Sequence, residues 1–461
     1  MDRRDFSRSL LTALGLSALG TGPLGAGQAG SGRGASMGSA GSGLASSGPL
    51  QDPGSLRING ARINGWIEEF SRFGRRPDGG VDRVAFSDAC LEGRAWVRSL
   101  MEHMGLGVRV DVAGNILGRY QGTDPALPPL WVGSHIDSVP AGGNYDGPLG
   151  SLGALEVVKT LQDAGVRPRH PVEVVIFVNE EGGKTGSRVM AGELQARELQ
   201  LETASGYTIG QGIRRLGGEP ERLDEGRVAP GSVAGFLEIH VEQGAVLEEA
   251  GLQIGVVEGI VGIRRWNATV RGAANHAGTT PMDRRRDALL GAARLVEAVN
   301  RVVTSIPGSQ VGTVGRIQAS PGAPNVIPGE AVLSIEVRAL EMTRIQEVFE
   351  GILEEAEGIG RDNGTPITLD EFYLSRAAPS DPRFREWVEA SAASLGLSHR
   401  RMPSGAGHDA QSVAQFAPMG MIFIPSVGGL SHHPDEYSRP EDIEAGVNVL
   451  LQALLRADRA L

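Results

Sequence analysis

A histidine and two aspartates in the first half of the chain have the residue types and spacing of a metal site. His135 and Asp137 follow the apolar run 130–132, which is typical of a buried strand, so a period of two points both side chains the same way. A carboxylate commonly holds a metal-binding imidazole in one tautomer. Asp146 follows in a glycine-rich loop that can return to the strand end, where its carboxylate can bridge two metal ions. Each residue alone is better explained as part of a polar loop, so the case depends on the other motifs.

Two adjacent glutamates, Glu180 and Glu181, come directly after a second apolar strand, 172–178. One carboxylate at such a strand end can bind metal while the other acts as a base on a water molecule. A solvated acidic turn is the usual explanation of a glutamate pair seen alone. The following residues 183–185, Gly-Lys-Thr, resemble the end of a phosphate-binding loop, but the pattern requires glycine at position 178, which is valine. This argues against nucleotide binding.

A third strand, 236–244, places Glu238, His240 and Glu242 on one face by the same period of two. His240 is therefore a candidate metal ligand. Gln243 lies at the exit of the strand and is a candidate substrate contact.

The first part of the chain predicts an α/β fold. Strand 130–134, helix 151–165 and strand 172–178 have the spacing of a βαβ unit with parallel strands. Open α/β sheets place their sites in the loops at the carboxyl ends of such strands. We therefore expect a catalytic domain with a mixed, mostly parallel sheet.

The pattern changes between residues 256 and 369, where the predicted order is βαββαβ, a ferredoxin-like inserted domain. The predicted elements are strand 265–270, helix 287–304, strands 312–318 and 331–337, helix 343–360 and strand 365–369. Within them, His276 can donate a hydrogen bond to an oxyanion, and Arg338 can bind a carboxylate through two parallel bonds. Each is more often structural when considered alone. The chain then returns to the first domain with two more motifs, 404–410 and 429–436.

The composition excludes several classes of protein. The chain has 461 residues, of which 40% are apolar and 21% charged, as expected of a globular protein with two or three domains. Its net charge is −11 and it has no basic stripe, which argues against nucleic acid as a partner. Its single cysteine, Cys90, excludes an internal disulfide and a cysteine-rich zinc site.

Residues 1–52 predict an export signal followed by a flexible linker. Arg3 and Arg4 precede Phe6 and the apolar stretch 10–19, which is too short to be a stable membrane anchor. A tract rich in glycine, serine and alanine follows. This order is that of a twin-arginine signal and predicts a periplasmic or exported location, with a disordered basic N-terminus as the alternative.

Taken together, six separate motifs occur in the order found in the hydantoinase/carbamoylase branch of the dinuclear metal-dependent aminoacylase and carboxypeptidase-like amidohydrolases. The chain resembles that branch from about residue 56 to its C-terminus. The resemblance implies hydrolysis of a carbon–nitrogen bond in a linear amide, first of all in N-carbamoyl-L-amino acids. Allantoate amidohydrolase and β-ureidopropionase are alternatives, and an exported dipeptidase or aminoacylase is a further one. A non-catalytic binding protein on this scaffold should have lost a ligand or the base, and none is missing.

The resemblance also implies a role for each candidate residue. One metal ion would be held by His135 and His240, and the second by Glu181 and His432, with Asp146 between them. Glu180 would be the general base, Asp137 would orient a ligand, and the substrate contacts would be Gln243, His276, Asn325, Arg338, Gly407 and His408. His432 is chosen over its neighbour His433 because the ligand of the family directly follows the serine.

The implied cofactors are two divalent ions, Zn²⁺ with Mn²⁺, Co²⁺ or Ni²⁺ as alternatives. The implied substrate is a small ureido or amide compound with a carboxylate. The implied assembly is a homodimer whose lid groups can serve the partner subunit. The implied domains are residues 53–255 and 370–461 for catalysis and 256–369 for a lid and dimerisation.

Two departures from the family pattern are Gly183-Lys184-Thr185, where a small residue, arginine and phenylalanine are usual, and Glu336, where aspartate is usual.

Overall fold

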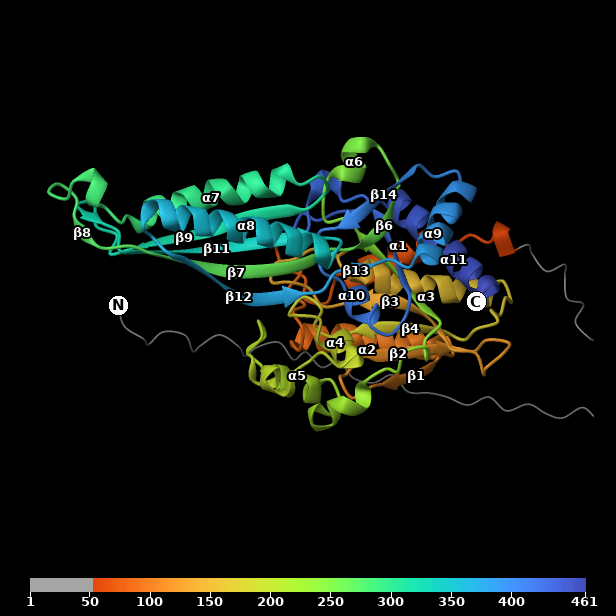
Figure 1. The fold of residues 1–461 in the computed structure, drawn as a ribbon. Coiled ribbons are helices and arrows are strands. Elements are labelled where there is room, and N and C mark those ends of the chain that lie inside the picture. Colours follow the sequence, from red (N-terminus) through yellow and green to blue (C-terminus); the bar gives the residue numbers. More distant parts are fainter. Residues whose placement is uncertain (1–52) are drawn as a thin grey trace, which may run out of the picture. The chain divides into compact units, whose positions relative to one another are not determined.

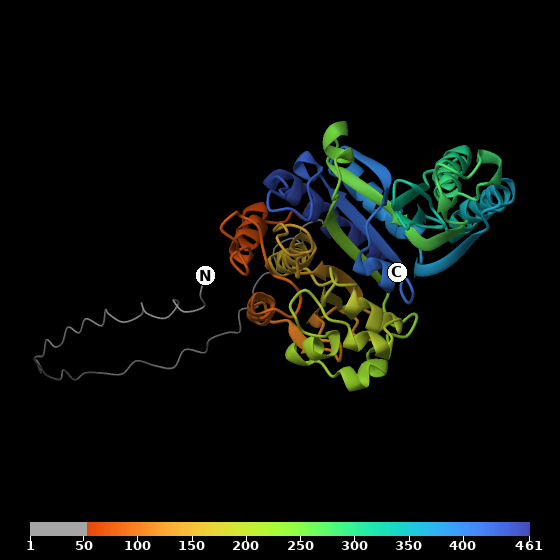
Figure 2. The same cartoon turned by 90° about the vertical axis from the view of Figure 1, so that its left-hand side faces the viewer.

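The computed structural model describes residues 53–461, and Figures 1 and 2 show them in two views. Within these residues, a nine-stranded mixed sheet, called here the main sheet, has the order β1-β2-β4-β3-β5-β15-β6-β13, with β14 paired to β6. Its strands are β1 (Gly107–Val110), β2 (Ile116–Tyr120), β3 (Leu130–His135), β4 (Val172–Phe177), β5 (Gly235–Val241), β6 (Ile254–Ile260), β13 (Ala378–Pro379), β14 (His399–Ser404) and β15 (Met419–Ile424).

The central strands of the main sheet run parallel, from β4 through β3 and β5 to β15. β1 and β2 form an antiparallel hairpin at one edge. The prediction of an α/β fold with a mixed, mostly parallel sheet is confirmed in these terms. The carboxyl ends of the central strands therefore meet at one edge, as parallel pairing requires.

Helices cover both faces of the main sheet because its strands are buried on both sides. Along β5, Leu237, Ile239 and Val241 pack into one core, whereas Phe236 packs into the other. The helices of the first core are α1 (Gly60–Phe70), α2 (Asp88–His103), α3 (Pro148–Asp163), α9 (Pro382–Ser394) and α11 (Pro440–Ala460). Those of the opposite face include α4 (Thr185–Ala191), α6 (Val246–Ala250) and α10 (Asp409–Val413), and α5 (Ile209–Arg215) follows α4 in the chain.

Residues 56–105 contain two helices, since α1 ends at Phe70 and α2 begins after the cap residue Ser87. The hydroxyl of Ser87 accepts a hydrogen bond from the Cys90 amide, which ends the loop and starts α2. Helix α3 begins directly after the Asp146 loop, with Pro148 in its first turn, where proline costs no hydrogen bond. Asp146 is thereby fixed at a helix start beside the sheet.

A second, antiparallel sheet of four strands, ordered β12-β7-β11-β9, lies in residues 262–375, called here the antiparallel unit. Helices α7 (Ala288–Ser305) and α8 (Met342–Asn363) cover one face of this sheet, as both views show (Figures 1 and 2). Its strands are β7 (Gly262–Arg271), β9 (Val311–Ser320), β11 (Glu330–Ala339) and β12 (Ile367–Ser375), and the short strands β8 (Asn275–His276) and β10 (Val326–Ile327) pair with each other.

Strict alternation of burial along β11 reflects one face turned to the helices and one left open. The chain enters the antiparallel unit at Val261, after β6, and leaves it at Arg376 and Ala377, before β13. Among residues 53–461, no helix combines the length and the apolar character needed to cross a bilayer.

Replacing Gly133 by alanine should prevent stable folding. Gly133 lies in β3 with φ +155°, and a Cβ there would lie 1.9 Å from the carbonyl oxygen of Val175 on the paired strand. We expect a loss of unfolding free energy of more than about 3 kcal/mol, or insoluble protein, because backbone atoms cannot move aside within the sheet. Gly65→Ala is the matched control, since nothing lies within 4 Å of a Cβ at that exposed helical position. Urea unfolding followed by circular dichroism measures both variants.

Candidate metal centre

Five side chains predicted as metal ligands meet at the carboxyl ends of the central strands. They are His135 at the end of β3, Asp146 before α3, Glu181 after β4, His240 in β5 and His432 after β15. They form two groups that share Asp146: His135 and His240 on one side, Glu181 and His432 on the other. Positions separated by almost 300 residues therefore converge because the four parallel strands β4, β3, β5 and β15 end together.

The two oxygens of Asp146 face different partners. Oδ1 lies 3.1 Å from Nε2 of His240 and 3.4 Å from Nε2 of His135. Oδ2 lies 3.4 Å from Nε2 of His432, which is 3.3 Å from Oε2 of Glu181. Asp146 is thus the central member of both groups.

The protonation of the two buried histidines fits a cation between these atoms. Nδ1 of His135 lies 3.0 Å from the carbonyl oxygen of Asp137, and Nδ1 of His240 lies 2.9 Å from that of Val241. A carbonyl only accepts, so each Nδ1 donates, and Nε2 is the atom of each ring that faces the Asp146 carboxylate and that a cation would bind. Nε2 of His240 is buried and has no hydrogen-bond partner among residues 53–461. Two donors of a tetrahedral zinc ion lie about 3.3 Å apart, which matches the observed spacing.

Buried carboxylates surround the same point. Burial raises the pKa of Glu180 to about 7, and burial together with the negative charge of Asp146 raises the pKa of Glu181 to about 9. Burial lowers the pKa of His240, but the Asp146 carboxylate outweighs it and brings the value to about 9. These carboxylates therefore repel one another, and a divalent cation would relieve that repulsion.

Asp137 contributes in a way that differs from the expectation. Its carboxylate is 3.8 Å from Nδ1 of His135, and its backbone carbonyl holds the imidazole instead. The carboxylate accepts hydrogen bonds from the amides of Glu180 and Glu181, both at 3.3 Å, so it holds the loop that carries the two glutamates. The period of two does not extend to Asp137 because β3 ends at His135.

Glu180 and two predicted substrate contacts border the same centre. Oε2 of Glu180 lies 3.9 Å from Nε2 of His135. Gln243, held in a left-handed conformation with φ +60°, donates from Nε2 to Oδ2 of Asp146 at 2.7 Å. His408 packs edge-on against the ring of His240, with 4.5 Å between ring centres. Burial and the neighbouring His240 keep the pKa of His408 well below its usual value, so it is neutral.

Arg338 and Gly407 lie where the antiparallel unit meets the loop 404–408. Arg338 donates from Nη1 to the carbonyl oxygen of Gly405 at 2.7 Å and from Nε to Glu336 at 2.7 Å. A Cβ on Gly407 would lie 3.3 Å from Nζ of Lys184, so this glycine leaves room for that ammonium group.

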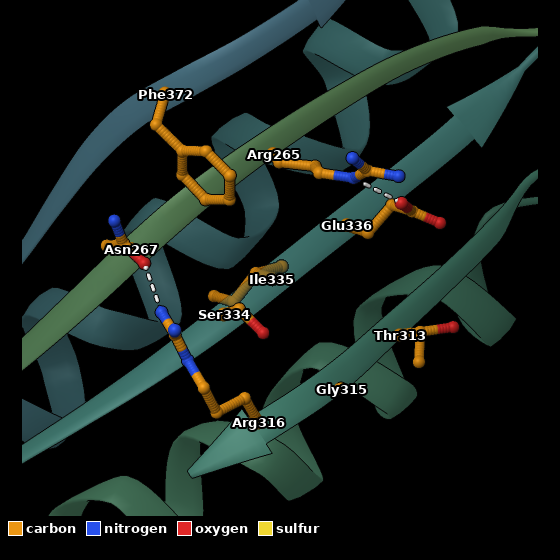
Figure 3. Close-up of a pocket in the computed structure, with 9 residues that line it drawn as sticks. All are labelled: Arg265, Asn267, Thr313, Gly315, Arg316, Ser334, Ile335, Glu336 and Phe372. Carbon is orange, nitrogen blue, oxygen red and sulfur yellow. Dashed lines mark hydrogen bonds and ion pairs between the residues drawn. The ribbon is translucent and has the colours of Figure 1, made fainter. Parts of the chain in front are cut away.

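A pocket of about 670 Å³ lies on the open face of the antiparallel sheet, and Glu336 is one of the residues that line it (Figure 3). In this pocket Arg265 points to Glu336 and donates to it at 2.5 Å, and Arg316 points to Asn267. Glu336 is therefore held between two arginines, Arg265 and Arg338. The pocket contains none of the predicted metal ligands, so it is a surface separate from the metal centre.

His276 and Asn325 are not brought to the metal centre of their own chain. His276 is exposed in β8, at the end of the antiparallel unit remote from the main sheet (Figure 1). β7 covers ten residues, about 30 Å, from the junction toward this end. The carbonyl of Asn325 accepts a hydrogen bond from the Ala277 amide at 3.0 Å, so the two residues belong to one local structure. The sequence motifs could not indicate this separation, because they carry no information on strand direction in space.

Two residues that hold Asp146 were missed in the sequence. Oε1 of the buried Glu436 accepts hydrogen bonds from the amides of Tyr145 and Asp146, both at 2.9 Å. The Ser431 hydroxyl lies 3.0 Å from Oδ2 of Asp146 and 2.9 Å from Glu436. Both lie in the motif 429–436, close to His432, and the acidic residue within that motif is the signal that the sequence offers.

Comparisons with known proteins agree with this geometry. The sequence matches the peptidase family M20/M25/M40 over residues 131–456. An N-carbamoyl-L-amino acid amidohydrolase of Geobacillus stearothermophilus is 38% identical over 398 residues, which are 85% of this chain and 97% of that protein. A ureidoglycolate hydrolase of Arabidopsis thaliana is 37% identical over 432 residues, 88% of this chain and 90% of that protein.

A solved structure extends the likeness to the fold. The amidase of the hydantoinase/carbamoylase family from Burkholderia multivorans has a TM-score of 0.79 and 38% identity, and the comparison covers 87% of this chain and 99% of that chain. These matches confirm the family that the motifs indicated and, with it, a hydrolase that acts on carbon–nitrogen bonds.

The prediction of a periplasmic or exported location is wrong, because the homologues of this chain are cytosolic enzymes. The twin-arginine pattern and the linker lie in residues 1–52, outside the described residues. An arginine pair before a short apolar run is a brief compositional pattern, and no converging set of side chains supports it.

Removal of divalent ions should destabilise the folded protein. After treatment with a chelator we expect a lower melting temperature, and addition of Zn²⁺ at a hundredfold excess over its Kd should restore about 3 kcal/mol. His240→Ala should lose most of this response, because it removes the buried imidazole nitrogen that faces Asp146. His103→Ala, an exposed histidine in α2, is the control and should respond like the unchanged protein. Equal responses of all three proteins would exclude the metal centre.

Proposed function

The chain belongs to peptidase family M20/M25/M40, and we propose that within it the protein hydrolyses N-carbamoyl-L-amino acids. The observation that carries the proposal is the position of Asp146 between two groups of metal-ligand side chains, with Glu180 beside them. Two relatives whose names state that activity match this chain over 97% and 98% of their own length. Allantoate amidohydrolase and β-ureidopropionase are the alternatives, because they cleave the same type of bond in other ureido compounds. A dipeptidase or aminoacylase on this scaffold is the more remote one.

We assign one metal position to His135 and His240, the other to Glu181 and His432, and a bridging role to Asp146. Their imidazole and carboxylate donors suit Zn²⁺, and Mn²⁺, Co²⁺ or Ni²⁺ are alternatives. Such a pair of ions, when bound, would lower the pKa of a water molecule enough to provide hydroxide at neutral pH.

Glu180 is the proposed general base. Its carboxylate lies at the edge of the centre, 3.9 Å from Nε2 of His135, and it belongs to neither of the two groups of proposed metal ligands. It would take the proton of the attacking water on Oε and later give it to the leaving nitrogen of the ureido group. Asp137 supports this role by holding the amides of the glutamate loop.

Arg338 is the proposed binding site for the substrate carboxylate, since its guanidinium lies at the junction beside the loop of Gly407 and His408. Gln243 would orient Asp146 and contact the ureido group. A substrate with a carboxylate near a ureido nitrogen fits these contacts, which selects carbamoyl amino acids over neutral amides.

We propose that the antiparallel unit is an inserted ferredoxin-like domain for lid closure and dimerisation. Its strands, in chain order, have the arrangement 4-1-3-2 with two helices on one face, as in that fold. In this proposal residues 53–255 and 370–461 form the catalytic domain, and 256–369 form the insert. His276 and Asn325 would serve the site of the partner subunit in a homodimer, His276 as an oxyanion donor, which explains their distance from their own centre.

A panel of substrates tests the proposed reaction. The metal-loaded protein should hydrolyse N-carbamoyl-L-amino acids faster than allantoate, ureidoglycolate, β-ureidopropionate or dipeptides, with ammonia measured for the ureido compounds and free amino acids for the dipeptides. Glu180→Gln should retain metal binding and lose about 10²–10⁴ in kcat, because it removes the proton acceptor. Metal content is measured by mass spectrometry alongside ammonia release. Full turnover by Glu180→Gln would refute the assigned base, and hydrolysis of dipeptides alone would refute the substrate class.

Mixing of inactive subunits tests the proposed dimer. His276→Ala and Glu180→Gln should each have little activity, since one lacks the oxyanion donor and the other the base. After joint unfolding and refolding, we expect recovery of about a quarter of full activity, because half of randomly paired dimers combine the variants and each has one intact site. If His276 acted within its own chain, the mixture would remain as inactive as its components.

A further inference from the structure

One side-chain amide, that of Gln411 in α10, holds both connections between the main sheet and the antiparallel unit. Its Nε2 donates to the carbonyl oxygen of Arg376 at 2.7 Å and to that of Val261 at 3.3 Å. Val261 joins β6 to β7, and Arg376 joins β12 to β13. The side chain is buried, with 5% of its surface exposed, so water does not replace these bonds easily.

The two connections lie against each other and are short. A Cβ on Gly262 would lie 2.8 Å from the amide nitrogen of Ala377, so the connections leave no room for a side chain there. A cavity of about 590 Å³ lies next to them, between β12 and α4, and is lined by residues that include Lys184, Phe372, Leu374 and Gln411. Packing on that side therefore does not fix the angle of the antiparallel unit. Changes of φ and ψ at so few connecting residues are the usual origin of a hinge.

The other end of the Gln411 amide leads to the catalytic glutamate loop. Its Oε1 accepts a hydrogen bond from Nζ of Lys184. The backbone amide of Lys184 donates to the carbonyl oxygen of Glu180 at 2.8 Å, so the two residues share one turn. Lys184 lies at one of the positions where this chain departs from the family pattern, which makes the link a property of this sequence.

Arg338 meets the same region from the antiparallel unit, through its bond to the carbonyl of Gly405, six residues before Gln411. The segment 405–411 thus contacts the proposed carboxylate-binding arginine, both connections and the turn of the proposed base.

We propose that Gln411 is a positioning residue that fixes the antiparallel unit, and with it Arg338, at one angle to Glu180. The proposal rests on the proposed function for the roles of Arg338 and Glu180. Gln411 touches no reacting atom in it. Its donors hold the hinge, and its acceptor ties the hinge to the glutamate loop.

A positioning role differs measurably from a merely structural one. Loss of the two donors should let the unit pivot, so that Arg338 holds the substrate carboxylate for a smaller fraction of time. Arg338 would bind that carboxylate equally in the ground state and the transition state, so KM should rise while kcat stays nearly constant. A structural role would instead lower the amount of active protein, which reduces apparent kcat and leaves KM unchanged.

Two substitutions test the proposal in the full-length, metal-loaded protein. Gln411→Met keeps the length and removes all three bonds, and Gln411→Glu keeps the acceptor for Lys184 and removes the two donors. For both we expect faster amide hydrogen exchange in peptides covering 258–264 and 374–379, unchanged exchange over 130–135, and a KM increase of about tenfold for the best carbamoyl substrate. Gln415→Met, at an exposed glutamine two residues after the end of α10, is the matched control and should change neither quantity.

The outcomes separate the two proposals. If the unchanged protein hydrolyses no ureido substrate, the proposed function fails, while the exchange of the two connecting peptides still reports on the hinge. If the unchanged protein is active and both variants keep its exchange and its KM, the role of Gln411 is refuted. Should Gln411→Met not fold, Gln411→Glu decides, because it retains the polar character and length of the side chain.

Discussion

The structure depends on one carboxylate that is shared by two groups of side chains. Asp146 is buried, and each of its oxygens faces imidazole nitrogen, from His135 and His240 on one side and from His432 on the other. Burial alone would protonate it, yet the three imidazoles hold its pKa well below the usual value. Hydrogen bonds orient the members of this buried, charged group. They involve backbone carbonyls, Glu436, Ser431 and Gln243. A divalent cation would complete this balance, and the rest of the fold supplies the strand ends that bring the group together.

Much of this could be predicted from the sequence, because the relevant information is local. The run 130–135 and the strand around His240 are apolar and short, which indicates buried strands, and each ends in polar residues that can only face a site. In the antiparallel unit, the alternation along 331–337 and the helical periods of α7 and α8 located each element within a few residues. The position of Glu180 and Glu181 at the end of a buried strand was also predicted correctly.

Other features depend on tertiary structure and could not be predicted. The carboxylate of Asp137 holds the glutamate loop and its carbonyl holds His135, which depends on where β3 ends rather than on residue type. The position of His276 depends on the direction in which β7 leaves the main sheet. The cytosolic location of the homologues overturns an inference from residues 1–52, where a short pattern had no structural constraint to support it. In each case the missing information was spatial or contextual, whereas the residue types themselves were recognised.

The order of the strands has a consequence for synthesis of the protein. β15 lies between β5 and β6 in the main sheet. In the chain, however, the whole antiparallel unit and then β13, α9, β14 and α10 come between β6 and β15. Emerging from the ribosome, the antiparallel unit can complete its own pairing, but β5 and β6 must wait for β15 as a neighbour. His432 follows β15, so no nascent chain that stops before residue 432 can complete the set around Asp146. A partly made chain would therefore hold apolar strand edges open, and chaperones that shield them would have their main task at this stage.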